Sequence, residues 1–233
     1  MTADHGRTAA RSAFFDRLSA TWSQAHYGPK GDMVARIARF ANALESLVPA
    51  SANILDYGCG TGDIAAALAS RGYRVEARDR SAKMIAQASA LHAGSGVCFV
   101  APADAAGEVL AGEQSFDAVI CSSVLEYLHD LAGSLRALAG ALKPGGWLIA
   151  TVPNMRHPSR RREASHRALM GSALMRALIR LTPRGETYEL NWLSHNRLPI
   201  PDWATLFRAA QLHPVWQDCE DHSLALLVGQ RSR

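Results

Sequence analysis

Between residues 7 and 47 the apolar side chains recur at spacings of three and four, a period that predicts amphipathic helices. The first series consists of Phe14, Phe15, Leu18 and Trp22. Gly and Pro residues in His26–Asp32 predict a loop after this helix, and Pro49 marks the end of a second one. Residues 1–50 are therefore expected to form a helical segment of their own.

The pattern then changes to short apolar runs that alternate with helical periods. Strands are predicted at Asn53–Tyr57, Tyr73–Asp79, Val97–Ala101, Phe116–Ser122 and Trp147–Val152. Helices are predicted at Gly62–Arg71, Ser81–His92 and Asp130–Leu142. Strands that alternate with helices indicate an α/β fold, a doubly wound and mostly parallel sheet with helices on both faces.

After Pro153 the alternation stops, and it returns only near the C-terminus. Residues 155–198 contain no strand pattern and are helical in their middle, over residues 165–181. Pro201–Gln211 then predicts a helix, and Pro214–Cys219 and Ser223–Gln230 predict two strands joined by a short turn. A connection this short favours an antiparallel hairpin. The expected divisions are 51–154 for the core, 155–198 for an inserted cap and 199–233 for the segment that completes the core.

Composition and charge narrow the class of protein. The chain has 233 residues, 48% of them hydrophobic, and no apolar run of the roughly 20 residues that a membrane helix needs. No secretory signal precedes the first helix, so a cytoplasmic location is expected. The four cysteines have no metal-ligand spacing, and they are expected to be buried and reduced, with no metal site.

The net charge of +4 is concentrated in the insert. Residues 155–198 contain nine arginines and three glutamates, a net charge of +6, so the remainder of the chain is slightly acidic. No aromatic residues are interleaved with this basic segment in the manner of a nucleic-acid-binding surface, and a nucleic-acid partner is not expected.

The candidate chemistry begins at "ILDYGCGTGD", where Gly58, Gly60 and Gly62 follow the first strand directly. A loop between a strand and a helix is the place where an open α/β sheet binds its ligand, and glycine lets a ligand approach the backbone. The spacing differs from the GxGxxG of dinucleotide folds, because Asp63 occupies the position of the last glycine. A negative charge at that helix start disfavours a phosphate ligand.

A second signal is Asp79, which ends the second strand seventeen residues after Gly62. A carboxylate at this strand end can accept hydrogen bonds from two adjacent ribose hydroxyls. The glycine loop alone could be a structural turn. Together with Asp79 it indicates a nucleoside-containing ligand.

Five segments in this order resemble the seven-stranded, class I S-adenosylmethionine-dependent methyltransferases of the small-molecule type. They are "LDYGCGTG", "ARDRSAKMI", "PADA", "FDAVICSSVLEYL" and "LKPGGWLIATVPN". The resemblance covers residues 54–154, and the closing helix and hairpin match the last two strands of the family. The opening "FFDRLSATWSQAHYG" resembles that of ubiquinone-biosynthesis-like methyltransferases, in which the N-terminal segment is a lid over the cofactor.

The resemblance implies S-adenosyl-L-methionine as the cofactor and assigns a role to several residues. Asp56, Gly58 and Gly60 would surround its methionine part, and Asp79 would hold the ribose. Met84 would pack near the adenine, Asp104 would accept from its amino group, and Ser122 would approach the sulfonium. The full set of expected cofactor-binding residues is Tyr27, Arg36, Asp56, Gly58, Cys59, Gly60, Asp79, Arg80, Met84, Asp104, Ala105 and Ser122.

A base is needed only for an acceptor that is protonated at neutral pH, such as a phenol with a pKa of about 10. His129 follows the fourth strand, and His195 lies in a polar and aromatic cluster at the end of the insert. Tyr127 stands where many related small-molecule enzymes have histidine, so it is a rival contact for the acceptor. His129, His195 and Tyr127 are the catalytic candidates, each against the alternative of an ordinary structural residue.

Three interpretations of the basic insert remain open: a cap with a solvated basic face, a cap over an anionic or apolar substrate, and, least favoured, a helix that contacts a membrane surface.

The predicted function is methyl transfer to a small organic acceptor, foremost O-methylation in quinone, lipid or secondary-metabolite biosynthesis. The alternatives are N- or C-methylation of a small metabolite and a cofactor-binding regulatory protein without catalysis. The oligomeric state is left open.

Overall fold

A computed structural model of the chain describes residues 2–29, 33–101, 114–169, 172–182, 185–218 and 222–233. Within these ranges it contains one sheet of seven strands. The strands are β1 (Asn53–Tyr57), β2 (Arg74–Arg78), β3 (Cys98–Val100), β4 (Phe116–Ser122), β5 (Leu142–Pro153), β6 (Leu212–Asp218) and β7 (Leu224–Arg231). The helices are α1 (Thr2–Tyr27), α2 (Val34–Leu47), α3 (Asp63–Ala69), α4 (Ala82–Leu91), a 3₁₀ turn η1 (Leu125–Tyr127), α5 (Leu131–Ala141), α6 (Pro158–Leu169), α7 (Ala173–Arg180), α8 (Gly185–Leu193) and α9 (Ile200–Ala209).

The strand order is β3-β2-β1-β4-β5-β7-β6. The first five strands of this order pair in parallel, and β7 runs antiparallel between β5 and β6. The predicted doubly wound sheet with an antiparallel C-terminal hairpin is confirmed. The order reverses between β1 and β4, which is the switch point where open α/β sheets bind ligands.

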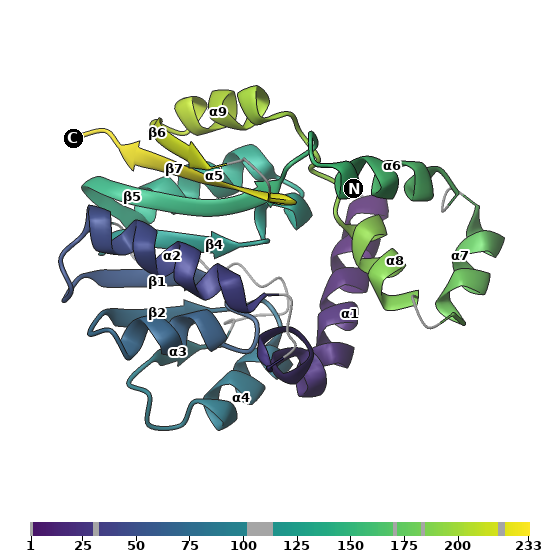
Figure 1. Ribbon diagram of the computed structural model, residues 1–233, viewed down its shortest axis with the longest axis horizontal. Coiled ribbons are helices and arrows are strands. Elements are labelled where there is room, and N and C mark those ends of the chain that lie inside the picture. The colour runs from purple at the N-terminus through teal and green to yellow at the C-terminus, as the bar shows by residue number, and fades with distance from the viewer. Residues whose placement is uncertain (1, 30–32, 102–113, 170–171, 183–184, 219–221) are drawn as a thin grey trace.

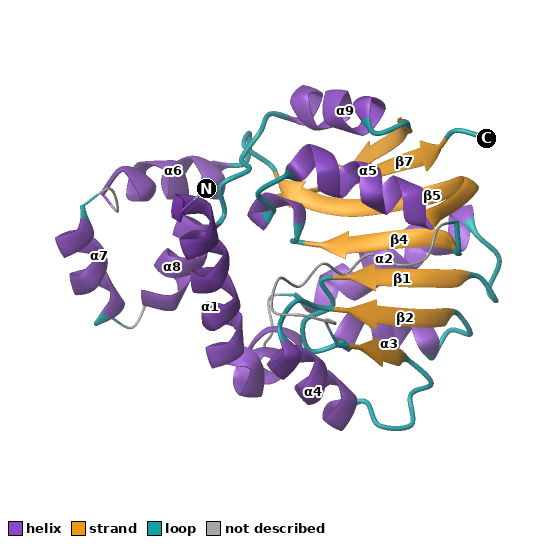
Figure 2. Cartoon of the chain, turned by 180° about the vertical axis from the view of Figure 1, so that it is seen from behind, coloured by secondary structure: helices purple, strands orange, loops and turns teal. Residues whose placement is uncertain are grey.

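Alternate residues of the central strands point to opposite faces of the sheet, and each face has its own apolar core. Ile54 of β1 packs with Phe40 and Leu44 of α2 on one face. Leu55, the next residue, packs on the other face with a cluster that includes Trp203 of α9. Figures 1 and 2 show α2 and α3 over one face and α5 over the other. Burial on both faces explains the continuous apolar runs within these strands, such as residues 118–121 of β4.

Two predicted elements differ from those observed. The strand expected from Trp147 begins at Leu142, because Leu142 already pairs with Phe116 before a register shift in β4. The single helix expected over residues 165–181 is instead two helices, α6 and α7, and a third, α8, follows. Ser172 is the N-cap residue of α7 and has an extended backbone, which breaks the helical path.

The helices that do not cover a face of the sheet, α1, α6, α7 and α8, gather at one end of the molecule. In Figure 2 the arrowheads of β1, β2 and β4 point toward α1, and α6, α7 and α8 lie beyond α1 on the same side. Phe14 and Leu18 of α1 are buried against Leu193 of α8. The N-terminal helix and the insert therefore both stand at the carboxyl ends of the parallel strands.

Within the part of the chain that the structure describes, no helix has the length and apolar character required to cross a membrane. Of the cysteines in that part, Cys121 is buried and Cys59 is partly buried. Cys98 is exposed, so the expectation that the cysteines are buried is wrong for this residue. Cys219 lies outside the described residues.

Candidate active site

A cavity opens at the carboxyl ends of β1, β2 and β4, between the sheet and the helices α1, α6 and α8. The sheet side contributes the glycine loop after β1, Asp79 after β2 and the residues that follow β4. The helical side contributes Phe15 and Trp22 of α1, Arg160 of α6 and Asn191 of α8. The cavity thus has one wall built by the core and one built by the segments added to it.

The three glycines of the loop have positive φ angles, and they serve different purposes. A Cβ atom at Gly58 would lie 2.4 Å from Cγ2 of Val124, and one at Gly62 would lie 2.6 Å from the ring of Phe99. These two positions need glycine for packing as well as for conformation. At Gly60 the nearest atom to an added Cβ would be Nε1 of Trp22 at 3.7 Å. Gly60 therefore leaves room on the cavity side of the loop, which suits a ligand lying against the backbone.

Asp79 is held by the two loops beside it. Its Oδ2 accepts a hydrogen bond from the backbone N–H of Gly60 at 2.9 Å, and its Oδ1 accepts from that of Ser81 at 2.8 Å. The Ser81 side chain caps α4 by accepting from the N–H of Met84. Burial raises the pKa of Asp79, and the two backbone hydrogen bonds act against burial. Each oxygen keeps a further lone pair, so the carboxylate can accept from two adjacent hydroxyls.

Asp56 is a buried carboxyl group of the site without a hydrogen-bond partner in the described chain. Its side chain is 1% exposed, and neither carboxylate oxygen has a hydrogen-bond partner among the residues described. Burial raises the pKa of Asp56 to about 8, and the nearby charge of Asp79 adds to the effect. Such a carboxyl group is stabilised when a cation binds next to it.

Arg36 of α2 also lines the cavity, and its charge acts on Tyr27, as that of Asp56 does, and on Glu126. Its Nη1 donates a hydrogen bond to Oγ of Ser123 at 3.0 Å, which fixes the guanidinium beside the residues that follow β4. The cavity thus offers an unpartnered carboxyl group and a guanidinium. The two complement the ammonium and the carboxylate of an amino-acid zwitterion, the form that the methionine part of S-adenosylmethionine takes.

An aromatic cluster forms the opposite wall. The ring of Phe15 meets those of Trp22 and Tyr127 edge to face, with centroid separations of 5.7 and 5.8 Å. Burial raises the pKa of the Tyr127 phenol, with the charge of Glu126 adding to it, and burial also raises that of the Tyr27 phenol. Both phenols stay protonated at neutral pH, so they can donate hydrogen bonds but cannot act as bases.

Glu126 in η1 brings a second buried carboxyl group to the cavity wall. Its main-chain oxygen accepts from the N–H groups of His195 and Asn196 at 2.9 and 3.0 Å, which anchors the segment after α8 to η1. The side chain is 3% exposed, and its Oε2 has no hydrogen-bond partner within the described chain. Burial raises the pKa of Glu126 to about 7.

The insert supplies a fixed positive charge and a hydroxyl on the same side. Nη1 of Arg160 donates to both carboxylate oxygens of Glu163, at 3.1 and 2.9 Å, and its Nε donates to the carbonyl of Ser223 at 2.9 Å. Arg197 reaches the same carboxylate of Glu163 at 2.9 Å. Ser194 also lines the cavity, and its buried Oγ has no partner among the residues that the structure describes.

Most of the residues predicted from the sequence are brought together at this cavity. Those that line it are Tyr27, Arg36, Asp56, Gly58, Cys59, Gly60, Asp79, Arg80, Met84, Ser122 and Tyr127. Asp104 and Ala105 lie outside the described residues. The roles given to the lining residues stay predictions, since the cavity shows their placement and not their ligands.

The two predicted histidines are placed differently. His129 and His195 lie against each other with ring centroids 5.0 Å apart, and neither is among the residues that line the cavity. Nε2 of His195 is 2.9 Å from the carbonyl oxygen of Leu128, so it must donate its proton there. This placement favours a structural role for His195 over that of a base.

Several residues of the cavity wall were not selected as site residues from the sequence, among them Phe15, Glu126, Arg160 and Ser194. Glu126 carried a usable signal, because it is an acid within the apolar run "SSVLEYL" directly after a predicted buried strand. Arg160 and Ser194 carried none, since nothing distinguishes them from the other arginines and serines of the insert. No group of three or more potential metal ligands occurs in the described part of the chain.

Comparison with known proteins identifies the class. Residues 25–218 match the family described as "Methyltransferase domain", so the chain belongs to this family. The chain is an S-adenosylmethionine-dependent methyltransferase.

The relatives include enzymes named ubiquinone biosynthesis O-methyltransferase. The chain is 34% identical to the one from Xanthomonas axonopodis pv. citri over 73% of its own length and 69% of the relative's. It is 30% identical to the one from Xylella fastidiosa over 81% and 77% of the two lengths. Among solved structures, it is similar to the Burkholderia thailandensis 1,6-didemethyltoxoflavin-N1-methyltransferase, with a TM-score of 0.61, 18% identity and coverage of 97% and 90%. That structure contains 1,6-didemethyltoxoflavin and S-adenosylhomocysteine.

Proposed function

We propose that this methyltransferase transfers the methyl group of S-adenosylmethionine to a hydroxyl of a small phenolic acceptor, of the class met in quinone biosynthesis. The observation that supports this most directly is the composition of the cavity. A side with the carboxyl groups of Asp56 and Asp79 adjoins a side with an aromatic wall and the buried carboxyl group of Glu126. The names of the relatives from Xanthomonas and Xylella point to the same acceptor class.

In this proposal the cofactor lies along the carboxyl ends of β1 and β2. Asp56 and Arg36 hold the ammonium and carboxylate of its methionine part, and Asp79 holds the ribose hydroxyls. Met84, which is 1% exposed at the start of α4, packs against the adenine. The unpartnered oxygens of Asp56 and the open side of Gly60 are the features of this chain that fit the cofactor.

The acceptor lies on the other side of the cavity, against α1 and η1. The edges of Phe15 and Trp22 and the ring of Tyr127 provide an apolar surface on which an aromatic acceptor can pack. Arg160, fixed by Glu163 and Ser223, favours an acceptor that is neutral or negatively charged. Ser194 supplies a hydroxyl that can hydrogen-bond a second polar group of the acceptor.

The bound cofactor supplies a methyl group that its sulfonium has already activated. The chain therefore contributes mainly by holding the acceptor oxygen in line with that methyl group. Such positioning can lower a barrier by roughly 7–11 kcal/mol. α1 helps to keep the two halves of the cavity in register, because Ser23 donates to Asp63 beside the glycine loop at 2.5 Å and Ser81 donates to Asp16 of α1.

The experiment that tests the proposal incubates the purified protein with methyl-deuterated S-adenosylmethionine and either catechol or aniline. We expect a mass shift in catechol, at oxygen, and none in aniline. Asp79→Asn should weaken cofactor binding by roughly 10- to 150-fold, as expected for the loss of hydrogen bonds to a charged group. Asp202→Asn, the same change at an exposed position on α9, is the matched control.

Methylation of aniline but not catechol would replace the proposal by N-methylation. Cofactor binding that depends on Asp79, with no methyl transfer to either compound, would contradict the proposed acceptor class.

A further inference from the structure

Glu126 is a buried ionisable group to which the proposed cofactor contacts assign no partner. It lies in η1, after the end of β4, and β1 separates β4 from β2, the strand that Asp79 follows. Its main-chain oxygen is used by the segment after α8, whereas its side chain, 3% exposed, has an Oε2 atom without a hydrogen-bond partner in the described chain. A carboxyl group kept in this state costs stability, and so it calls for a functional explanation.

We propose that the Glu126 carboxylate accepts the proton of the acceptor hydroxyl as the methyl group is transferred. The inference rests on the proposed function, because it requires an acceptor whose reacting group carries a proton. It assigns the role of base to Glu126, whereas the sequence suggested His129 and His195 for that role.

The other ionisable groups near the acceptor are less suited to this step. Nε2 of His195 donates to the Leu128 carbonyl at 2.9 Å, and the ring does not line the cavity. The Tyr127 phenol lines the cavity, but burial raises its pKa, so it keeps its proton. Asp56 is at the cofactor end, beside the glycine loop.

The surroundings of Glu126 balance two opposing effects. Burial raises its pKa, while the hydrogen bond from its own backbone N–H and then the charges of Arg160, Arg36 and Arg197, in order of their effect, lower it. Burial prevails, and the pKa of Glu126 is about 7. A general base is most effective when its pKa is near the working pH, which is the condition that this balance creates. The charged and titratable groups that face Glu126 are Arg36 from α2, Cys121 from β4, Tyr127 from η1, Arg160 from α6, and His195 and Arg197 after α8.

The step is balanced without any further reactant. The O–H bond of the acceptor breaks and its proton goes to a carboxylate oxygen of Glu126. An oxygen electron pair forms the new O–CH₃ bond, while the electron pair of the S–CH₃ bond returns to sulfur and leaves a neutral thioether. Glu126 then loses its proton to water when the product leaves, and its pKa of about 7 allows this at neutral pH.

The first test compares wild type with Glu126→Gln on two acceptors, catechol and 4-nitrocatechol. The nitro group makes a hydroxyl acidic enough to ionise near neutral pH, so this acceptor needs no base. We expect Glu126→Gln to lower kcat on catechol by roughly 100- to 1,000-fold, the usual contribution of a general base. On 4-nitrocatechol the loss should be less than about 10-fold, since only the proton transfer is removed.

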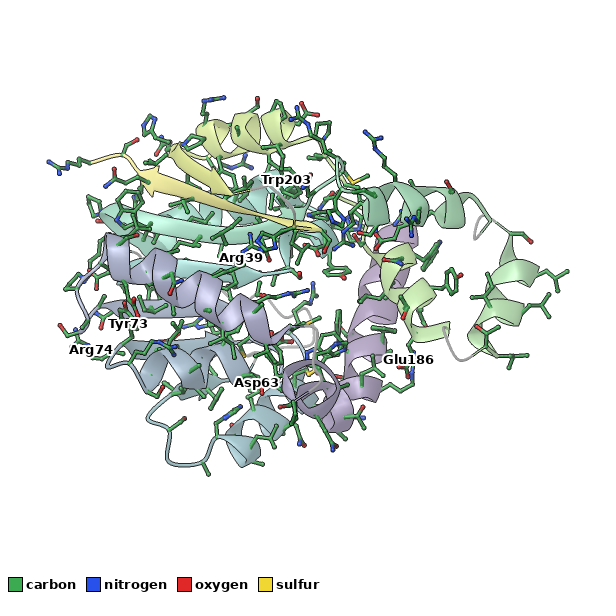
Figure 3. All side chains as sticks on the ribbon, in the orientation of Figure 1. Arg39, Asp63, Tyr73, Arg74, Glu186 and Trp203 are labelled. Carbon is green, nitrogen blue, oxygen red and sulfur yellow. The ribbon has the colours of Figure 1, made fainter. Side chains whose placement is uncertain are left out.

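At saturating cofactor, Glu126→Gln should also change the pH profile of the rate on catechol. The rate of wild type should fall as the pH drops below about 7, because protonated Glu126 cannot accept a proton. Glu126→Gln should lose this limb and show a rate that rises toward the pKa of the catechol itself. Glu186→Gln removes the same charge from an exposed position on α8, labelled in Figure 3, and should leave both rates and the profile unchanged.

The second test does not depend on turnover or on one variant. The absorbance of 4-nitrocatechol bound to the complex with S-adenosylhomocysteine reports the ionisation of its hydroxyl. A carboxylate in contact disfavours a second negative charge, so the midpoint should lie about one pH unit higher in wild type than in Glu126→Gln. Should Glu126→Gln fail to fold, Glu126→Asp keeps a carboxylate and should retain the acid limb at a lower kcat.

The outcomes distinguish a failure of the role proposed for Glu126 from a failure of the proposed function. Equal slowing of both acceptors by Glu126→Gln, with an unchanged ionisation midpoint, would overturn the role of Glu126 and leave the proposed function intact. Failure of wild type to bind or methylate either compound would overturn the phenolic acceptor and, with it, this inference.

Discussion

Cofactor binding should expel a proton from Asp56. In the free protein this carboxyl group is buried without a hydrogen-bond partner in the described chain, and burial raises its pKa to about 8. It is therefore mostly protonated at pH 7. The ammonium of the cofactor's methionine part, placed next to it, favours the charged form and should bring the pKa back toward the ordinary range of a carboxylate.

The magnitude follows from that pKa. A group with a pKa of about 8 is protonated in about nine molecules of ten at pH 7 and in about half of them at pH 8. Binding should then release about 0.9 proton at pH 7. Since the proton must leave first, the apparent affinity at pH 7 should be about ten times weaker than it would be with Asp56 fully ionised.

Calorimetry measures this release directly. The heat of binding S-adenosylhomocysteine is recorded at pH 7 in buffers of different ionisation enthalpy, and the slope gives the number of protons. Asp56→Asn should reduce that number to about zero, and 5′-methylthioadenosine, which lacks the ammonium, should release none from wild type. A slope near zero for wild type would refute the assignment of Asp56 to the ammonium.

The remaining predictions concern stability and acceptor binding. Gly58→Ala should lower the free energy of unfolding by about 1–3 kcal/mol in chemical denaturation, because the φ of Gly58 is +78° and an added Cβ would lie 2.4 Å from Val124. Gly60→Ala should lower the free energy of unfolding less, and its main effect should be weaker cofactor binding. Asp56→Asn should raise the melting temperature of the free protein by a few degrees at pH 8. The unfolded chain ionises Asp56 near pH 4, whereas the folded protein keeps it protonated up to about pH 8, so the wild type loses stability as the pH rises between these values. The gain in melting temperature from Asp56→Asn should therefore shrink toward pH 4 in thermal scans. Phe15→Ala should raise KM for catechol more than it lowers kcat in steady-state kinetics, since the two edge-to-face contacts it loses are each worth about 0.5–1.5 kcal/mol.

The core of the fold could be predicted because its signals are local. The strands β1 and β4 contain continuous apolar runs. Helix α4 begins after Ser81, whose side-chain oxygen accepts a hydrogen bond from the N–H of the third helical residue. The glycine loop and Asp79 each follow a strand directly. Parallel strands bring their carboxyl ends to one edge of the sheet, so predicting the strands was enough to bring these residues together.

The acceptor side could not be predicted in the same way, since its residues come from elements that are distant in the sequence. Glu126 follows β4, Arg160 is in α6 and Ser194 follows α8. What joins them is the packing of α1 against α8 through Phe14, Leu18 and Leu193. The insert has no internal pattern that sets this arrangement.

The histidines illustrate the limit of choosing bases by residue type. His195 was selected for its nearness to polar and aromatic residues, yet its Nε2 bonds to the Leu128 carbonyl and its backbone N–H to that of Glu126. Both contacts tie the end of the insert to η1. The residue thereby helps to place Glu126, which the sequence offered only as one acid in an apolar run.

The central claim is that one cavity holds the cofactor against Asp56 and Asp79 and the acceptor against Glu126. A crystal structure of the protein with S-adenosylhomocysteine and catechol tests this most directly. We predict an ammonium within hydrogen-bond distance of Asp56, a ribose on Asp79, and a catechol hydroxyl about 2.6–3.2 Å from a Glu126 oxygen and facing the sulfur. Catechol bound elsewhere, or with its hydroxyls turned toward His129 and away from Glu126, would contradict the account.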